Sequence, residues 1–181
     1  MSKTIVYISM TLDGFVAGKN DDLSWLMPYS TVDYGYNEFY STIGAIILGK
    51  RTYDHIISNW DWPYSNVPAF VLSDSPLKNI PKSAEIHAAN GDIADVLHQA
   101  KSKTEKDIWI GGGAHVVQEF LNKGLADELI ITVVPVLLGG GIRLLENIMS
   151  GVELKLHHTK SYDKGLVQLS YGVTHRESNS K

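Results

Sequence analysis

The chain has 181 residues and a formal net charge of −4, which suits one domain with a substantial core and argues against general nucleic-acid binding. It contains no cysteine, so disulfides, thiolate metal sites and cysteine nucleophiles are excluded, and its seven histidines are too scattered to suggest a metal site. No run reaches the ~18 apolar residues of a membrane span, and we expect a cytoplasmic protein with no nucleic-acid or membrane partner.

The first predicted strand, residues 5–10, is apolar on both faces and therefore suits the centre of a sheet. It leads into a loop, residues 11–22, that is rich in glycine and acidic residues and is of the kind that often covers a site. Trp25 follows as a large apolar group in polar surroundings. This indole either plugs the core or forms a wall of a substrate pocket.

A helix is predicted over residues 33–42, where Asp33 is either an N-cap or an acid that faces a ligand. The next strand, residues 45–48, runs into Gly49, Lys50, Arg51 and Thr52 at the start of a second helix. Two cations at a helix start oppose the helix dipole unless an anion binds there. This junction therefore predicts a phosphate ligand, and solvated surface charges are the alternative.

The middle of the chain alternates strands and helices up to a triple glycine. Strands are predicted over residues 67–72 and 84–88 and a helix over residues 92–102. A short strand, residues 108–110, then enters Gly111, Gly112 and Gly113 and a new helix. A glycine run at a helix N-terminus lets a phosphate approach the main chain, although it can also be only a tight turn.

The last third of the chain is predicted to be mainly β. Residues 128–138 form a long apolar strand in which Pro135 suggests a bulge or an edge, and a hairpin follows over residues 152–161 and 166–173. An apolar edge would be an aggregation hazard, so we expect a homodimer built on these terminal strands. We expect residues 1–175 to form one domain and residues 176–181 to form a polar tail.

The alternation of elements predicts a three-layer α/β fold. A mainly parallel, twisted sheet would carry helices on both faces and an antiparallel C-terminal hairpin at one edge. Ligands of such sheets bind at the carboxyl ends of the strands. Asp13, Lys50, Ser73 and Gly111 all follow strand ends, and we expect them to converge on one crevice.

Four motifs, in this order, resemble the dihydrofolate-reductase-like superfamily: residues 11–18, 48–53, 110–113 and 135–139. The resemblance extends from Ile5 to about Val173 and is closest to the reductase domain of the bifunctional riboflavin-biosynthesis deaminase–reductase. The zinc deaminase domain of that enzyme has no counterpart here. The resemblance implies NADPH as the cofactor.

The resemblance also implies roles for particular residues. Lys50 and Arg51 would hold the 2′-phosphate of NADPH, Thr52 and the glycines would contact the pyrophosphate, and Ser73 would lie along the adenosine. The full set of expected cofactor contacts is Val16, Ala17, Gly49, Lys50, Arg51, Thr52, Leu72, Ser73, Gly111, Gly112, Gly113 and Ala114. The expected substrate contacts are Ser9, Asp13, Trp25 and Arg143, and the expected catalytic carboxylates are Asp33 and Asp13.

Three functions are compatible with these patterns. The first is an NADPH-dependent reductase that transfers a hydride to a C=N or C=O carbon of a small heterocyclic or ribosylated pyrimidine, with reduction of a pterin as a variant. The second is a nucleotide-binding module without efficient chemistry. The third is a structural dimerisation protein in which the glycines are only turns.

Overall fold

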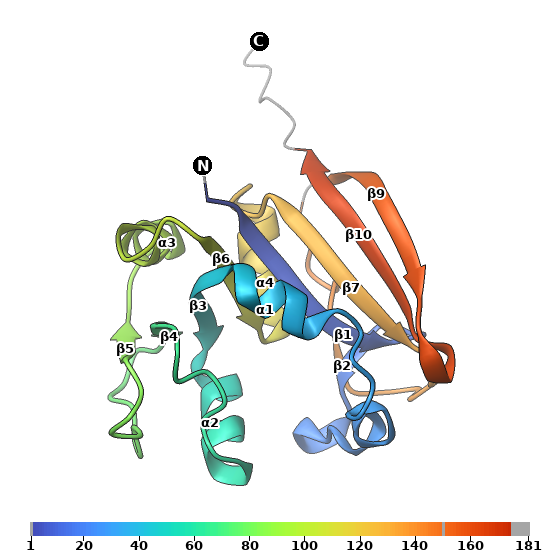
Figure 1. Ribbon diagram of the computed structural model, residues 1–181, viewed down its shortest axis with the longest axis horizontal. Helices are drawn as coiled ribbons and strands as arrows, with labels where there is room; N and C mark the ends of the chain where they lie inside the picture. Colours follow the sequence, from blue (N-terminus) through green and yellow to red (C-terminus); the bar gives the residue numbers. More distant parts are fainter. Residues whose placement is uncertain (1, 150, 175–181) are drawn as a thin grey trace.

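The computed structural model describes residues 2–149 and 151–174, which form an eight-stranded sheet in the order β5-β4-β3-β6-β1-β7-β10-β9 (Figure 1). The predicted tail, residues 176–181, lies outside the described residues. The strands of the sheet are β1 (Thr4–Thr11), β3 (Ile43–Gly49), β4 (Ala69–Leu72), β5 (Ile86–Ala89), β6 (Asp107–Gly112), β7 (Glu128–Val134), β9 (Glu153–Ser161) and β10 (Val167–Thr174). The α-helices are α1 (Tyr36–Thr42), α2 (Lys50–Asn59), α3 (Ile93–Ser102) and α4 (Ala114–Asn122).

The sheet is parallel from β5 to β7 and antiparallel at β10 and β9. Apolar side chains of α3 and α4 pack on one face of the sheet, and those of α1 and α2 pack on the other. The strands of the parallel part are buried on both sides, as their continuous apolar runs predicted. The predicted three-layer fold with a C-terminal hairpin is confirmed.

The long strand predicted over residues 128–138 is shorter in the structure. β7 ends at Val134, directly before Pro135, whose nitrogen has no hydrogen to donate to a ladder. β7 also lies between β1 and β10, so its apolar residues are internal to the sheet. β7 is therefore not the apolar edge on which the homodimer prediction was based, and the two edge strands of the sheet are β5 and β9.

A small second sheet lies at the carboxyl ends of the parallel strands. It pairs β2 (Phe15–Ala17) with β8 (Ile142–Arg143). Gly141 has a φ of +141°, and a Cβ at this position would come 2.1 Å from the carbonyl oxygen of Ala17. Only glycine permits this approach. The second glycine run therefore holds the first loop over the strand ends.

Two short 3₁₀ segments, η1 (Lys19–Asp21) and η2 (Ser24–Tyr29), continue that loop. In Figure 1 they lie on the opposite side of the strand ends from α2. A third, η3 (Asp163–Gly165), joins the hairpin strands. Within residues 2–149 and 151–174, no helix has the length and apolarity that a membrane crossing requires.

Candidate active site

A cavity of about 1160 Å³ opens at the carboxyl ends of the parallel strands. Its walls come from β1, β3 and β6, from the starts of α2 and α4, and from the segment with η1 and η2. The structure brings together most of the residues expected from the sequence. Those that line the cavity are Ser9, Val16, Ala17, Trp25, Gly49, Lys50, Arg51, Thr52, Leu72, Ser73, Gly111, Gly113 and Ala114.

Two helix starts meet at one end of this cavity. Gly49 precedes α2 and Gly113 precedes α4, and neither helix has a side-chain hydrogen bond at its N-cap. A Cβ on Gly113 would come 3.3 Å from the hydroxyl oxygen of Thr52, so the two junctions are in contact. The first N–H groups of two helices and one hydroxyl therefore border the same space, which is the environment that binds phosphate groups.

Both cations at this end are already paired with carboxylates. Lys50 forms an ion pair with Asp54 on the next turn of α2. The guanidinium of Arg51 reaches across to η1, where its Nε and Nη2 lie 2.9 and 2.8 Å from the two carboxylate oxygens of Asp21. A phosphate bound to Arg51 would therefore compete with Asp21.

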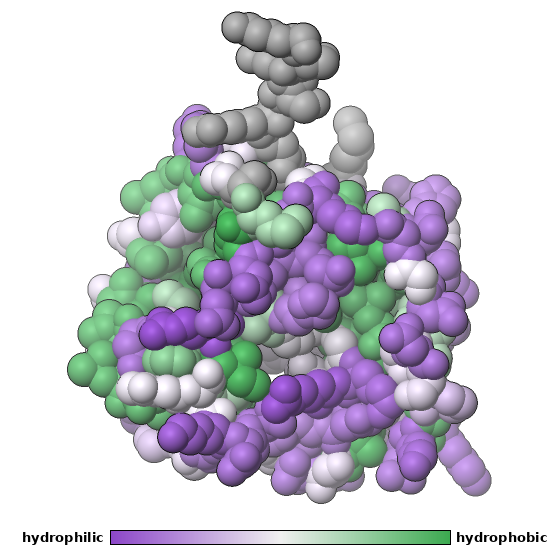
Figure 2. Space-filling view, turned by 180° about the vertical axis from the view of Figure 1, so that it is seen from behind, coloured by the Kyte–Doolittle hydropathy of each residue, from purple (hydrophilic) through white to green (hydrophobic). Residues whose placement is uncertain are grey.

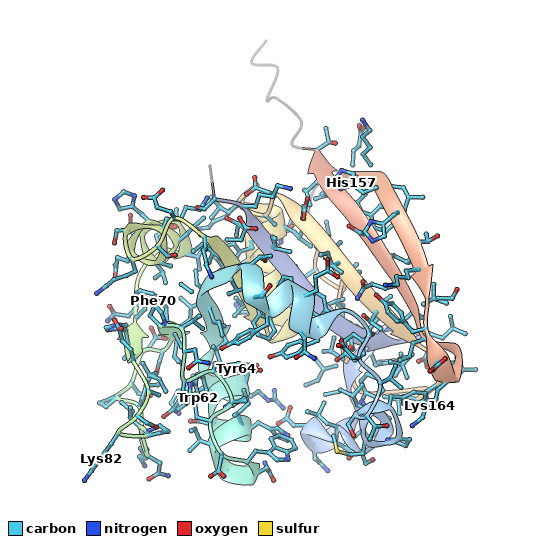
Figure 3. All side chains as sticks on the ribbon, viewed as in Figure 1. Trp62, Tyr64, Phe70, Lys82, His157 and Lys164 are labelled. Carbon is cyan, nitrogen blue, oxygen red and sulfur yellow. The ribbon has the colours of Figure 1, made fainter. Side chains whose placement is uncertain are left out.

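Aromatic side chains form another part of the cavity lining. Tyr64, from the loop after α2, lies 5.2 Å from Trp109 of β6, and Tyr36 of α1 lies 6.0 Å from the same indole, both measured between ring centroids. Figure 3 shows Tyr64 beside Trp62, which packs on Tyr53 of α2. Of these rings, those of Tyr36, Tyr64 and Trp109 line the cavity and offer flat, apolar surface to a planar ligand.

The tyrosines of this wall keep their protons at neutral pH. Burial raises the pKa of Tyr36 to about 12. Burial also raises the pKa of Tyr64 and the pKa of Tyr7 well above the usual value. Their hydroxyl groups therefore remain hydrogen-bond donors across the physiological range.

A buried amide holds part of the aromatic wall in place. Gln168 of β10 is 6% exposed, and its Nε2 lies 3.2 Å from the hydroxyl oxygen of Tyr7, 3.0 Å from the carbonyl oxygen of Tyr34 and 3.1 Å from the hydroxyl oxygen of Thr132. The Tyr7 hydroxyl in turn donates to the Tyr34 carbonyl oxygen at 3.1 Å. The C-terminal hairpin therefore helps to position two rings of the cavity.

Asp13 does not line the cavity. Its carboxylate accepts hydrogen bonds from the Thr11 hydroxyl at 2.6 Å and from the backbone N–H groups of Leu138 and Gly139 at 3.0 and 2.8 Å. The Thr11 hydroxyl, followed by the Gly139 N–H, holds the pKa of this carboxyl below its usual value. Asp13 thus ties the first loop to the second glycine run, which differs from the expected contact with substrate.

Asp33 also lies outside the cavity lining. Its carboxylate accepts hydrogen bonds from the backbone N–H groups of Gly35 and Tyr36 and from the side chain of Asn37, each at 3.0 Å. The Asn37 amide contributes most to lowering the pKa of Asp33. These contacts hold the turn that leads into α1, whose N-cap is Gly35 rather than Asp33, and they engage the carboxylate outside the cavity.

Two further expected site residues are placed elsewhere. The guanidinium of Arg143 lies 4.5 Å from the centroid of the Phe15 ring and donates to the backbone oxygen of Asp13 at 3.3 Å, away from the cavity. Gly112 has a φ of +96°, and a Cβ there would point at the side chain of Ile8 at 3.4 Å. Of the three glycines, Gly111 and Gly113 line the cavity and Gly112 supports the turn between them.

Several residues of the cavity were not among those expected from the sequence. They come from the segments around η1 and α1 and from the second half of α2 with the loop after it. The sequence marked residues 59–66 only as an aromatic loop, because nothing local indicates which face such a loop covers. This group includes Asp21, Tyr36, His55, Trp60, Asp61 and Tyr64.

The fold and this cavity together define a dihydrofolate-reductase-like protein with a nucleotide-sized cleft. The model of the RibD C-terminal domain family matches residues 2–168, and the chain belongs to that family. YwjB of Bacillus subtilis (strain 168) is 34% identical over 171 residues, which cover 93% of this chain and 97% of YwjB.

Solved structures agree with this assignment. A protein of Shewanella sp. PV-4 that is named for riboflavin biosynthesis superposes with a TM-score of 0.86 at 28% identity, over 96% of this chain and 99% of that one. The deaminase/5-amino-6-(5-phosphoribosylamino)uracil reductase of Thermotoga maritima superposes with a TM-score of 0.71 at 15% identity, over 96% of this chain and 57% of that one. Dihydrofolate reductase from Enterococcus faecalis, complexed with NADP(H), superposes with a TM-score of 0.68 at 18% identity, over 96% of this chain and 97% of that one. The chain has the family and the fold of oxidoreductases.

Among residues 2–149 and 151–174, no group of three or more histidine, aspartate or glutamate side chains is arranged to hold a metal ion.

Proposed function

We propose that this chain is an NADPH-dependent reductase that transfers a hydride to a C=N or C=O carbon of a small, planar heterocycle. The observation that carries the proposal is one cavity with two kinds of lining. Two helix N-termini, a lysine and an arginine line it together with tyrosine and tryptophan rings. Such a cavity suits a phosphorylated cofactor in contact with a flat reactant.

The residues at the two helix starts fit NADPH. The pyrophosphate would lie against the N–H groups that follow Gly49 and Gly113, beside the Thr52 hydroxyl. Arg51 and Lys50 would meet the 2′-phosphate through charge-assisted hydrogen bonds. Leu72 and Ser73 end β4 at the same edge of the sheet and would lie along the adenosine, while Val16 and Ala17 would cover the nicotinamide.

NADPH supplies the hydride in such a reaction, and the protein supplies position and a proton. Holding two flat reactants in contact lowers a barrier by roughly 7–11 kcal/mol when the geometry is right. Asp13 and Asp33 are engaged in loop contacts, so we assign delivery of the proton to water held beside Ser9 and Tyr36, two residues that line the cavity.

The test combines binding with turnover. NADPH and NADH are each titrated while the melting temperature is followed, and NADPH oxidation is then measured with pyrimidine and pterin substrates. NADPH is expected to raise the melting temperature more than NADH does, and at least one heterocycle is expected to accelerate NADPH oxidation. A protein that NADPH does not stabilise would refute the proposal.

Two alternatives give different results in the same experiment. A dihydrofolate-reductase-like activity predicts turnover with a pterin and none with a pyrimidine. A nucleotide-binding module predicts stabilisation by NADPH without turnover of any heterocycle.

We further propose that the chain is a cytoplasmic homodimer that pairs through the edge strand β9. All residues of β9 are exposed, including Leu154 and Leu156, and Val167 of β10 is also partly exposed. Figure 2 shows hydrophobic surface gathered on the left, the side on which β9 and β10 lie. An open edge of this kind is a template for pairing with a second chain. Sedimentation at micromolar concentration tests the dimer, and a monomer would refute it.

A further inference from the structure

Two tyrosines of the cavity carry hydroxyl groups that have no hydrogen-bond partner in the described chain. Tyr36, the first residue of α1, and Tyr64, in the loop after α2, both line the cavity and are both partly buried. Within residues 2–149 and 151–174, neither hydroxyl forms a hydrogen bond. A hydroxyl removed from bulk water destabilises the fold unless a ligand or water pairs with it. The cavity is the space from which such a partner can come.

The rings that carry these hydroxyl groups are held against one indole. The ring centroids of Tyr36 and Tyr64 lie 6.0 and 5.2 Å from that of Trp109, which is 6% exposed and also lines the cavity. The indole N–H of Trp109 donates to the backbone oxygen of Tyr7 at 3.0 Å, so the indole itself is fixed to β1. Figure 3 shows Tyr64 between α1 and α2. Two segments that are distant in the chain therefore present their hydroxyl groups from one rigid support.

The acidity of these phenols agrees with their proximity. Burial is the main reason that the pKa of Tyr64 lies well above its usual value, and the phenols of Tyr36 and Tyr40 raise this pKa further. Burial raises the pKa of Tyr36 to about 12, and Tyr40 contributes to that shift as well. Phenols influence one another in this way when they lie close together. At neutral pH both hydroxyl groups keep their protons, so each can donate one hydrogen bond to an acceptor.

Tyr40 of α1 belongs to the same cluster of rings but faces a different environment. Its ring stacks on that of Tyr36, with 5.7 Å between the centroids, and lies 6.2 Å from that of Tyr64. The Tyr40 hydroxyl is also without a partner among the described residues, but it is sealed inside the chain, and Tyr40 does not line the cavity. A ligand in the cavity can therefore reach the first two tyrosines and not the third.

We propose that Tyr36 and Tyr64 select the substrate by donating hydrogen bonds from their hydroxyl groups to two acceptors on one edge of a planar heterocycle. This inference rests on the proposed reductase function and deepens it. Suitable acceptors are the ring carbonyl oxygens and ring nitrogens of uracil-like and pterin-like compounds. A site with two such donors rejects ligands that lack the acceptors, because both donors would then stay unpaired.

The test compares three variants that each lose one oxygen atom: Tyr36→Phe, Tyr64→Phe and Tyr40→Phe. Each variant keeps its ring and loses a hydroxyl that has no partner in the described chain. The probes are 5-amino-6-(5-phosphoribosylamino)uracil and dihydrofolate. Each probe is titrated into the protein with NADP⁺ at saturation, so that no hydride is transferred, and binding is followed by quenching of tryptophan fluorescence.

The two cavity variants and the sealed variant are expected to behave differently. Tyr36→Phe and Tyr64→Phe should each weaken binding of the heterocycle that the natural chain binds by about 2- to 12-fold, which corresponds to one lost hydrogen bond. Their NADPH affinity and their melting temperature without ligand should not fall, because no hydrogen bond within the chain is lost. Tyr40→Phe should leave heterocycle binding unchanged and should keep or raise the melting temperature, because an unpaired buried hydroxyl is removed.

Tyr7→Phe serves as the control for a hydroxyl that supports the fold. The Tyr7 hydroxyl donates to the backbone oxygen of Tyr34 and accepts from Nε2 of Gln168, so this variant should lower the melting temperature without ligand. A fall of the same size in Tyr36→Phe or Tyr64→Phe would show that their hydroxyl groups support the fold, and it would overturn the inference.

The remaining outcomes separate this inference from the proposed function. Unchanged heterocycle binding in either cavity variant overturns the inference, and so does an equal loss of binding in Tyr40→Phe. Binding of neither heterocycle while NADPH still stabilises the protein overturns the inference and leaves the cofactor assignment standing. If NADPH does not stabilise the natural chain, the reductase proposal fails and the inference fails with it. Weaker heterocycle binding in the two cavity variants alone supports the inference.

Discussion

Replacing Asp21 by asparagine is expected to tighten NADPH binding. In the structure the carboxylate of Asp21 occupies the guanidinium of Arg51 through two contacts of 2.8 and 2.9 Å. A 2′-phosphate bound to Arg51 must displace this carboxylate or share the guanidinium with it. Asparagine keeps the size of the side chain and removes the charge, so Arg51 becomes free for the phosphate.

The size of the effect follows from the exposure of the pair. The Arg51 side chain is 72% exposed and that of Asp21 is 33% exposed, so solvent screens their attraction. Exposed ion pairs contribute about 0.2–1 kcal/mol. At about 1.4 kcal/mol per tenfold change, NADPH affinity should rise by about 1.4- to 5-fold. NADH has no 2′-phosphate, and its affinity should stay within error.

Isothermal titration of both cofactors into four proteins tests this reasoning: the natural chain, Asp21→Asn, Arg51→Ala and the double variant. Arg51→Ala is expected to weaken NADPH and spare NADH. In the Arg51→Ala background, Asp21→Asn should have no further effect on NADPH, because its partner is gone. Weaker NADPH binding in Asp21→Asn, or an equal change for NADH, would refute the assignment of Arg51 to the 2′-phosphate.

Three further predictions separate supporting residues from cofactor contacts. Asp33→Asn should retain activity and stability because an asparagine oxygen can accept the same hydrogen bonds in the turn before α1, whereas Asp33→Ala should lower the melting temperature by about 2–4 °C at unchanged turnover; loss of turnover in Asp33→Asn would restore the catalytic assignment. The pKa of Asp13 is lowered in the folded chain, so its stabilising contribution is present above the usual value of 3.8 and is lost as the pH falls below it. Thermal melts should therefore show a smaller loss on acidification for Asp13→Asn than for the natural chain, and parallel curves would contradict this. Gly112→Ala should lower the melting temperature without ligand, because its φ is +96°, while Gly113→Ala, which extends toward Thr52 in the cavity, should mainly reduce the shift that NADPH adds. The reverse pattern would show that these glycines were assigned the wrong way round.

The amino-acid sequence determined the layers of the fold and the cofactor end of the cavity. Both depend on local patterns: continuous apolar runs that form buried strands, and glycines that follow those strands at helix starts. Because parallel strands end at one edge of a sheet, Lys50, Ser73 and Gly111 could be expected to meet there, and they line the same cavity.

The tertiary structure decided which polar groups face that cavity. Asp13 follows a strand and Asp33 precedes a helix, and catalytic acids often occupy such positions. The carboxylate of each, however, accepts hydrogen bonds from backbone N–H groups outside the cavity. Arg143 follows a glycine run, and its guanidinium stacks on Phe15 instead. The directions of the Asp13 and Arg143 side chains depend on partners that are distant in the chain, and no local pattern encodes them. The partners of Asp33, by contrast, lie within four residues of it.

The substrate end of the cavity was also decided at this level. Asp21 meets Arg51 across 30 positions of sequence, and Gln168 meets Tyr7 across 161. The aromatic wall joins residues from β6, α1 and the loop after α2. Hydrophobic periodicity, a local pattern, predicts that such rings are buried. It does not predict which rings contact one another, because those contacts depend on how the layers pack.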